Sequence, residues 1–235
     1  MSDSLYLIEE ATDIFEKIVT LHEQALIEDL DRSLSFKVKN FLETLNSSLD
    51  YAAYDLFEIF CLEKAKLRHK NINHIKRKIY FPCYPQEKTF DKEVNKCFVG
   101  LESDHKEIFQ LLKKSQPFYC GDFWLKEFKN ITNESKHIKL TRNKKLKSGV
   151  INYATIPGIN MSNLQFKGSE HPFSVNGVPV KDLNNNPYTS QYNGKVNAYF
   201  SFEKTKKPVL DTLQFYLKMI KGIVTQINSY CESNS

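Results

Sequence analysis

Asn46, Asp50 and Tyr54 are spaced four residues apart, and side chains with this spacing share one face of a helix. A carboxylate flanked by an amide and a phenol along such a face can bind a basic side chain, and Lys136 or His137 is the candidate partner. Polar groups in a packed helical interior are costly unless they satisfy one another. The stripe therefore predicts a shared site or a structural hydrogen-bond network, and a solvated helix face is the third interpretation.

A second polar segment, residues 133–137, reads Asn-Glu-Ser-Lys-His and falls where a helix should end. Histidine titrates near neutral pH, so His137 is suited to general acid–base catalysis. Asn133 and Lys136 are suited to capping the helix and to interacting with its negative end, which is the structural alternative for this segment. The candidate catalytic residues from both segments are Asn46, Asp50, Asn133, Lys136 and His137.

The charge of the chain is strongly asymmetric. Residues 1–63 hold four basic and fourteen acidic residues, a net charge of −10, whereas residues 64–235 hold 29 basic and 14 acidic ones, a net charge of +15. Residues 64–78 alone contain seven basic residues and no acidic one. Such clusters attract phosphate backbones, unless they pair with acidic residues of the same chain or stay solvated. The candidate nucleic-acid-binding residues are Lys64, Lys66, Arg68, Lys76, Arg77, Lys78, Arg142, Lys144 and Lys145.

Arg68 and His74 form an alternative catalytic pair within this basic segment. A guanidinium group stabilises phosphate charge and an imidazole moves a proton. The Arg-His-x4-His pattern resembles the Rx4-6H signature of HEPN ribonucleases, in which the arginine and histidine act on the 2′-hydroxyl and scissile phosphate of RNA without a metal ion. In those enzymes the motif usually lies on a helix at a dimer interface, whereas here it falls at or beyond the end of the second expected helix.

Five main helices are expected to position these residues. Apolar residues recur in them at three- and four-residue steps, which is typical of amphipathic helices packed on a core. The first two should pair as an antiparallel hairpin. After the second helix, two prolines within residues 80–85 predict an extended loop. The expected helices span residues 4–30, 34–66, 101–115, 121–135 and a last segment that begins at Pro208.

Short runs rich in Val, Tyr, Phe, Asn and Gly replace the helical pattern near residue 148. Asn176-Gly177 predicts a two-residue hairpin. Alternating apolar residues over 196–202 predict a strand preceded by Asn193-Gly194. The predicted fold is α+β: a mainly helical bundle over residues 1–147, an inserted small antiparallel sheet over 148–205, and a C-terminal helix over 206–235 that packs back on the bundle.

Two helical segments together resemble a known family. Residues 45–54 resemble the LRSALDHLAY helix of a widespread group of bacterial proteins, and residues 133–137 resemble its N-x-DKH element. The loop at 80–82 and the turn at 116–119 also fit that group. The group is similar to HEPN-like helical bundles, which occur in nucleotide-linked defence and toxin systems. The resemblance implies a metal-independent ribonuclease or an RNA-binding effector in bacterial antiviral defence or toxin–antitoxin control.

Several classes of protein are excluded by what the sequence lacks. It contains no P-loop, no dinucleotide-binding GxGxxG, no HExxH and no GxSxG, so neither a cofactor nor a metal is expected. It contains five cysteines, which is an odd number, and none of them has the short spacing of zinc ligands. This pattern predicts free thiols. The N-terminus has no signal-peptide pattern and no apolar run is long enough to span a bilayer, so we expect a cytoplasmic protein without membrane contact.

Two hypotheses of function follow. The first is an RNA-directed protein with RNA as its partner and a homodimer as its assembly. The second is a non-catalytic interaction module in which both polar segments are structural. In the resembled group, arginine often stands at the position of Asn46 and histidine at that of Tyr51. If those two residues carry chemistry in the group, this chain has lost it. A histidine or carboxylate in an open, concave site favours the first hypothesis, and a closed, fully paired network favours the second.

Overall fold

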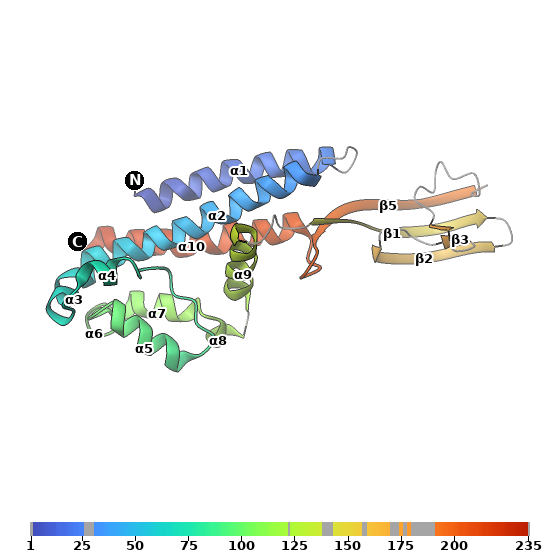
Figure 1. Cartoon of the computed structure of the whole chain (residues 1–235). Coiled ribbons are helices and arrows are strands. Elements are labelled where there is room, and N and C mark those ends of the chain that lie inside the picture. Colours follow the sequence, from blue (N-terminus) through green and yellow to red (C-terminus); the bar gives the residue numbers. More distant parts are fainter. Residues whose placement is uncertain are drawn as a thin grey trace. The chain divides into compact units, whose positions relative to one another are not determined.

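The chain folds as a mainly helical α+β protein, which confirms the predicted fold class (Figure 1). The computed structural model describes residues 2–25, 31–121, 123–137, 143–156, 159–169, 174–175, 178–179 and 191–234. The chain divides into two compact units. The first consists of Met1–Ile18, Phe36–Thr141 and Leu213–Ser235, and the second of Val19–Ser35 and Arg142–Thr212.

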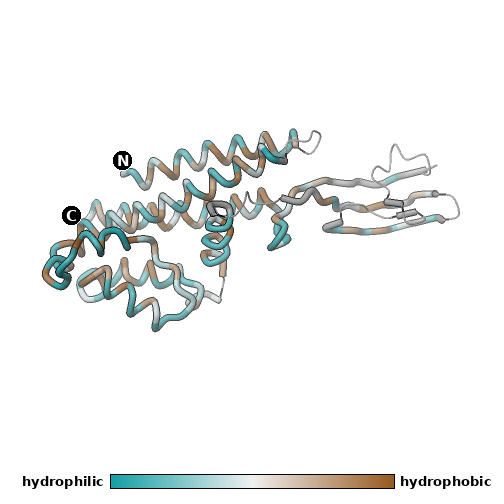
Figure 2. Tube along the Cα trace, viewed as in Figure 1, coloured by the Kyte–Doolittle hydropathy of each residue, from teal (hydrophilic) through white to brown (hydrophobic). Residues whose placement is uncertain are grey.

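Long helices build the core of the first unit, which takes most of α1 (Asp3–Ala25), α2 (Asp31–Leu56) and α10 (Val209–Asn234). Apolar bands recur along these helices (Figure 2). The predicted stripes are largely confirmed, because their central side chains are fully buried: Val38, Phe41, Leu42, Leu45, Leu49, Leu213, Ile220, Val224 and Ile227. The predicted first helix extends to residue 30, and residues 26–30 lie outside the described part of the chain.

The second predicted helix continues through a π-helical turn. After α2, the π-helix η1 (Phe57–Cys61) leads into α3 (Leu62–Arg68). Such turns insert an extra residue into the α-helical ladder and change the direction in which the following side chains point. The helical run predicted for residues 34–66 is therefore present but is not uniformly α-helical.

Shorter helices complete the first unit. The helix α5 (Glu87–Cys97) was not predicted, because only Phe90 and Val94 are buried on it and two apolar residues make a weak periodic signal. The helix predicted over 101–115 is broken at His105, whose backbone is non-helical. The remaining helices are α4 (Ile72–Lys76), α6 (Leu101–Asp104), α7 (Lys106–Lys114), α8 (Pro117–Cys120) and α9 (Trp124–His137).

The second unit contains an antiparallel sheet in the order β2-β1-β5. Its strands are β1 (Asn143–Ile156), β2 (Ile159–Ser169) and β5 (Gln191–Phe202). A separate two-stranded hairpin pairs β3 (Ser174–Val175) with β4 (Val178–Pro179). Because Val175 pairs with Val178, the predicted two-residue connection is confirmed, although Asn176-Gly177 themselves lie outside the described residues.

Asn193-Gly194 lies inside β5, so the prediction that it precedes the strand was wrong. The pairing with β1 shifts between Ile151 and Tyr153, and Asn152 donates a side-chain hydrogen bond to Asn193 over 2.9 Å. A bulge of this kind tolerates asparagine and glycine within a strand. Turn-type residues therefore mark an irregular pairing here and not the end of the strand.

Candidate functional site

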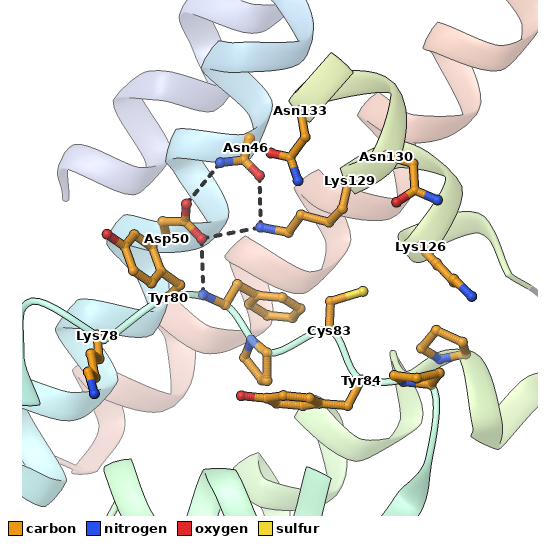
Figure 3. A pocket seen from close by; sticks show the side chains of 14 residues that line it. Asn46, Asp50, Lys78, Tyr80, Cys83, Tyr84, Lys126, Lys129, Asn130 and Asn133 are labelled. Carbon is orange, nitrogen blue, oxygen red and sulfur yellow. Dashed lines mark hydrogen bonds and ion pairs between the residues drawn. The ribbon is translucent and has the colours of Figure 1, made fainter. Parts of the chain in front are cut away.

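A polar network joins α2 to α9 (Figure 3). Asn46 and Asp50 lie one turn apart on α2, and the Asn46 amide donates to Asp50 Oδ2 over 2.9 Å. Lys129 on α9 donates to Asn46 Oδ1 over 2.7 Å and lies 3.3 Å from Asp50 Oδ1. Both charged side chains are less than a fifth exposed, at 16% for Lys129 and 19% for Asp50. Partial burial makes this pair stronger than an exposed ion pair.

The loop at residues 80–85 is held in place by side chains from both directions. Asp50 Oδ1 accepts the backbone N–H of Phe81 over 3.0 Å. From the other side, the fully buried Gln116 donates to Pro82 O and accepts from the Tyr84 N–H, both over 2.9 Å. These contacts satisfy main-chain groups that have no helix or sheet partner. The predicted extended loop is thus an ordered part of the site.

A pocket of about 670 Å³ lies between this loop and the polar faces of α2 and α9, within the first unit. The loop contributes aromatic rings, prolines and one thiol to its wall, and the helices contribute amides and charged groups. Its lining residues are Asn46, Asp50, Lys78, Tyr80, Phe81, Pro82, Cys83, Tyr84, Pro85, Pro117, Lys126, Lys129, Asn130 and Asn133. Its volume is in the range of sites that bind small ligands.

The pocket carries three amino groups and one carboxylate. Asp50 offsets the charge of Lys129, whereas Lys78 and Lys126 form no ion pair or hydrogen bond with their side chains to any other described residue. Asn130 and Asn133 are exposed, and their amides are likewise unbonded within the described part of the chain. The pocket therefore carries a net positive charge and two amides that bond to no other described residue. Both features suit an anionic, polar ligand.

The Cys83 thiol and the Tyr84 phenol of the loop are both neutral groups. Burial raises the pKa of the Cys83 thiol, although nearby Lys129 and Lys126 partly offset the rise. Burial also raises the pKa of the Tyr84 phenol, and the neighbouring Glu93 adds to the rise. A protonated thiol is a poor nucleophile. The loop thus offers neutral surface to a ligand, and the charge of the pocket comes from the helices and from Lys78.

The structure brings together three of the five predicted catalytic residues. Asn46, Asp50 and Asn133 all line the pocket. Lys136 and His137 belong to the last turn of α9, and their side chains lie outside the described residues. The basic partner of Asp50 that the structure describes is Lys129, which the sequence analysis did not single out.

Lys126 was also missed, although the sequence carries a signal for both lysines. Lys126, Lys129, Asn130 and Asn133 follow one another at helical steps of three, one and three residues, so they form a polar face on α9. That face continues the polar segment that ends at His137. Extending the second polar segment by two turns toward the N-terminus would have found the pocket wall.

Arg68 and His74, the alternative catalytic pair, make different contacts in the structure. Arg68 donates to Asn95 O over 3.0 Å, and His69 lies 2.9 Å from Lys96 O, so both bond the C-terminal carbonyls of α5. His74 is exposed at the start of α4, where its backbone N–H bonds the Asn71 side chain over 3.1 Å. Neither Arg68 nor His74 lines the described pocket.

Several of the predicted phosphate-binding lysines are paired with acidic residues. Lys64 pairs with Asp104, Lys66 lies 2.6 Å from Glu63, and Lys76 lies 3.4 Å from Glu58. Pairing with acidic residues of the same chain is the alternative to phosphate binding that the charge asymmetry left open. Arg142 and the side chains of Lys144 and Lys145 lie outside the described residues.

Comparisons of this chain with protein-family models, curated proteins and solved structures give no match. Within the described helices, none combines the length and the apolar character needed to cross a membrane. A search of the described residues also finds no group of three or more histidine, cysteine, aspartate or glutamate side chains placed to hold a metal ion. The resemblance to HEPN-like bundles therefore stays an expectation from two short motifs.

Proposed function

We propose that the protein is an RNA-directed, HEPN-like protein that binds single-stranded RNA in the pocket between α2, α9 and the loop at 80–85. The observation that carries the proposal is the charge of Lys78 and Lys126 in a concave site, which no carboxylate of the described residues offsets. Amino groups without a carboxylate partner are available to phosphate, and phosphate contacts supply most of the affinity of sequence-independent RNA binding.

Rings and amides in the same pocket favour RNA over a simple anion. The Tyr80 side chain is 61% exposed at the pocket wall, so it is open to stacking by an unpaired base. The amides of Asn130 and Asn133, which bond to no other described residue, carry both donors and acceptors that suit the edges of nucleobases. Duplex bases are already stacked and paired, so this combination supports single-stranded RNA.

Binding is better supported than cleavage. The pocket residues that the structure describes include no histidine, and Asp50 already accepts hydrogen bonds from Asn46, Lys129 and Phe81. A carboxylate engaged in this way positions other groups and is a poor general base. Cleavage would depend on His137, and a role in bacterial defence or toxin–antitoxin control rests on the resemblance alone.

Fluorescence anisotropy with a short, labelled single-stranded RNA tests the proposal. Lys126→Gln should weaken binding roughly three- to tenfold and lower the slope of log affinity against log salt by about 0.7, since one phosphate contact is lost. Lys221→Gln is the matched control, because it removes one exposed lysine of α10 outside the pocket. Equal affinity for the wild type and both variants would overturn the proposed site, and absence of RNA binding would overturn the function.

Incubation of the same RNA without metal tests the catalytic form of the proposal. Cleavage by the wild type that is lost in His137→Ala and kept in His74→Ala would establish a ribonuclease and identify its histidine. Intact RNA with all three proteins, together with measurable binding, would establish an RNA-binding effector. The expected homodimer stays a prediction, which sedimentation velocity can measure.

A further inference from the structure

Charge is distributed unevenly along the pocket, and this layout gives more detail about the ligand. Figure 3 places Lys78 and Lys126 at opposite ends of the site, with Lys129 between them. The charge of Lys129 is offset by Asp50, with which it forms an ion pair at 3.3 Å. The pocket is thus positive at both ends and close to neutral in the middle.

Neutral groups that can contact a base occupy the middle of the pocket. In Figure 3, the neutral side chains of Tyr80, Cys83 and Tyr84 come from the loop, and those of Asn130 and Asn133 come from α9. The Asn133 amide is unbonded within the described part of the chain, and the Tyr84 phenol is neutral, since burial raises its pKa further above the ordinary value. Aromatic rings and amides in one pocket wall suit a planar group with hydrogen-bonding edges.

The order of positive, neutral and positive regions matches one repeating unit of a nucleic acid strand. Each nucleoside in a single strand is neutral and lies between two anionic phosphates. We infer that the pocket binds one nucleoside flanked by two phosphates, with Lys78 at one phosphate, Lys126 at the other and the base against the neutral side chains of the pocket wall. This inference rests on the proposed function and specifies the part of the RNA that the site recognises.

A nucleoside 3′,5′-bisphosphate is the smallest molecule with this chemistry, and the free molecule could itself be the ligand. The test is competition against the labelled single-stranded RNA by adenosine 3′,5′-bisphosphate, 5′-AMP and 3′-AMP. The bisphosphate should displace the RNA at about a tenfold lower concentration than either monophosphate, because only it reaches both lysines. If the free bisphosphate binds more tightly than the RNA, the free nucleotide is the preferred ligand of the pocket.

Variants identify which phosphate each lysine contacts. Lys78→Gln and Lys126→Gln should each abolish the advantage of the bisphosphate over one of the two monophosphates, and Lys221→Gln should preserve it. The three lysines are exposed and form no side-chain hydrogen bond or ion pair with the described residues, so circular dichroism should confirm that all variants fold.

The outcomes separate this inference from the proposed function. RNA binding that depends on Lys126, without any advantage of the bisphosphate over the monophosphates, would overturn the inference and leave the function standing. An advantage that persists in both lysine variants would also overturn it, because the phosphates would then bind elsewhere. If the wild type binds neither RNA nor nucleotide, both the inference and the proposed function fail.

Discussion

Asp50 accepts the backbone N–H of Phe81 over 3.0 Å, across 31 residues of sequence. The contact fixes the loop that forms one wall of the pocket to the helix that forms another. The same carboxylate receives the Asn46 amide and the Lys129 ammonium group. Asp50 is therefore the residue through which α2, α9 and the loop are held together.

Asp50→Ala should destabilise the protein substantially. The change leaves the Phe81 N–H, the Asn46 amide and the Lys129 amine without their shared acceptor, which should lower the free energy of unfolding by about 2–3 kcal/mol. Urea denaturation followed by circular dichroism measures the loss. Asp13→Ala on α1 removes an exposed carboxylate and should change stability by less than about 0.5 kcal/mol. Equal effects of the two changes would contradict the proposed role of Asp50.

His22 should make the protein less stable in mild acid. Its ring packs edge-on against Phe200, with centroids 5.3 Å apart, and accepts the Phe200 N–H over 3.5 Å. Burial lowers the pKa of His22, and Glu23 partly offsets this. As the pH falls through the ordinary histidine value of about 6.5, the unfolded chain binds a proton that the folded chain does not, so stability falls.

His22→Gln should reduce this pH dependence, because glutamine keeps an acceptor for the Phe200 N–H but does not titrate. The measurement is the free energy of unfolding at about pH 7.5 and about pH 5.5 for both proteins. His105, whose pKa is also lowered by burial and by Lys64, stays in the variant and retains its own contribution. An unchanged difference between the two pH values would show that His22 is not protonated more readily on unfolding.

Two glycines provide a matched pair of backbone substitutions. Gly100 has φ of +87°, and a Cβ there would lie 2.6 Å from Lys64 Cδ, so Gly100→Ala should lower stability by about 1–3 kcal/mol. Gly222 is helical within α10 and has nothing within 4 Å of its Cβ position. Gly222→Ala should raise stability by about 0.5–1 kcal/mol, since alanine favours the helix. Thermal unfolding compares the two, and shifts of the same sign would contradict the argument.

The buried thiols should resist alkylation in the native protein. Burial raises the pKa of Cys61 to about 12 and that of Cys231 to about 11. At about pH 8 only roughly one in 10⁴ and one in 10³ of these thiols is the reactive thiolate. Mass spectrometry after iodoacetamide treatment should find the half-buried Cys83 and Cys97 modified before Cys61 and Cys231. These four thiols should react together in denaturant, and early native labelling of Cys61 would contradict its burial.

Local sequence patterns predicted much of the secondary structure. The apolar stripes of α2 and α10 are strong because several turns of helix bury the same face, and these helices were found close to their predicted places. The short helix α5 was missed, since only Phe90 and Val94 reveal its buried face. The break at His105 and the π-turn at η1 were missed for a similar reason, because apolar spacing is nearly the same with and without them.

The sequence by itself determined which faces are polar: the stripe with Asn46 and Asp50 on α2, and the face with Asn133 on α9. Only the tertiary structure decided that Lys129, 79 residues from Asp50, is its partner, because helical periodicity does not specify which faces meet. The tertiary structure also decided which lysines remain available to an anionic ligand. Lys64, Lys66 and Lys76 lie beside carboxylates, whereas Lys78 and Lys126 pair with none among the residues that the structure describes. This difference depends on distances in space that composition cannot encode.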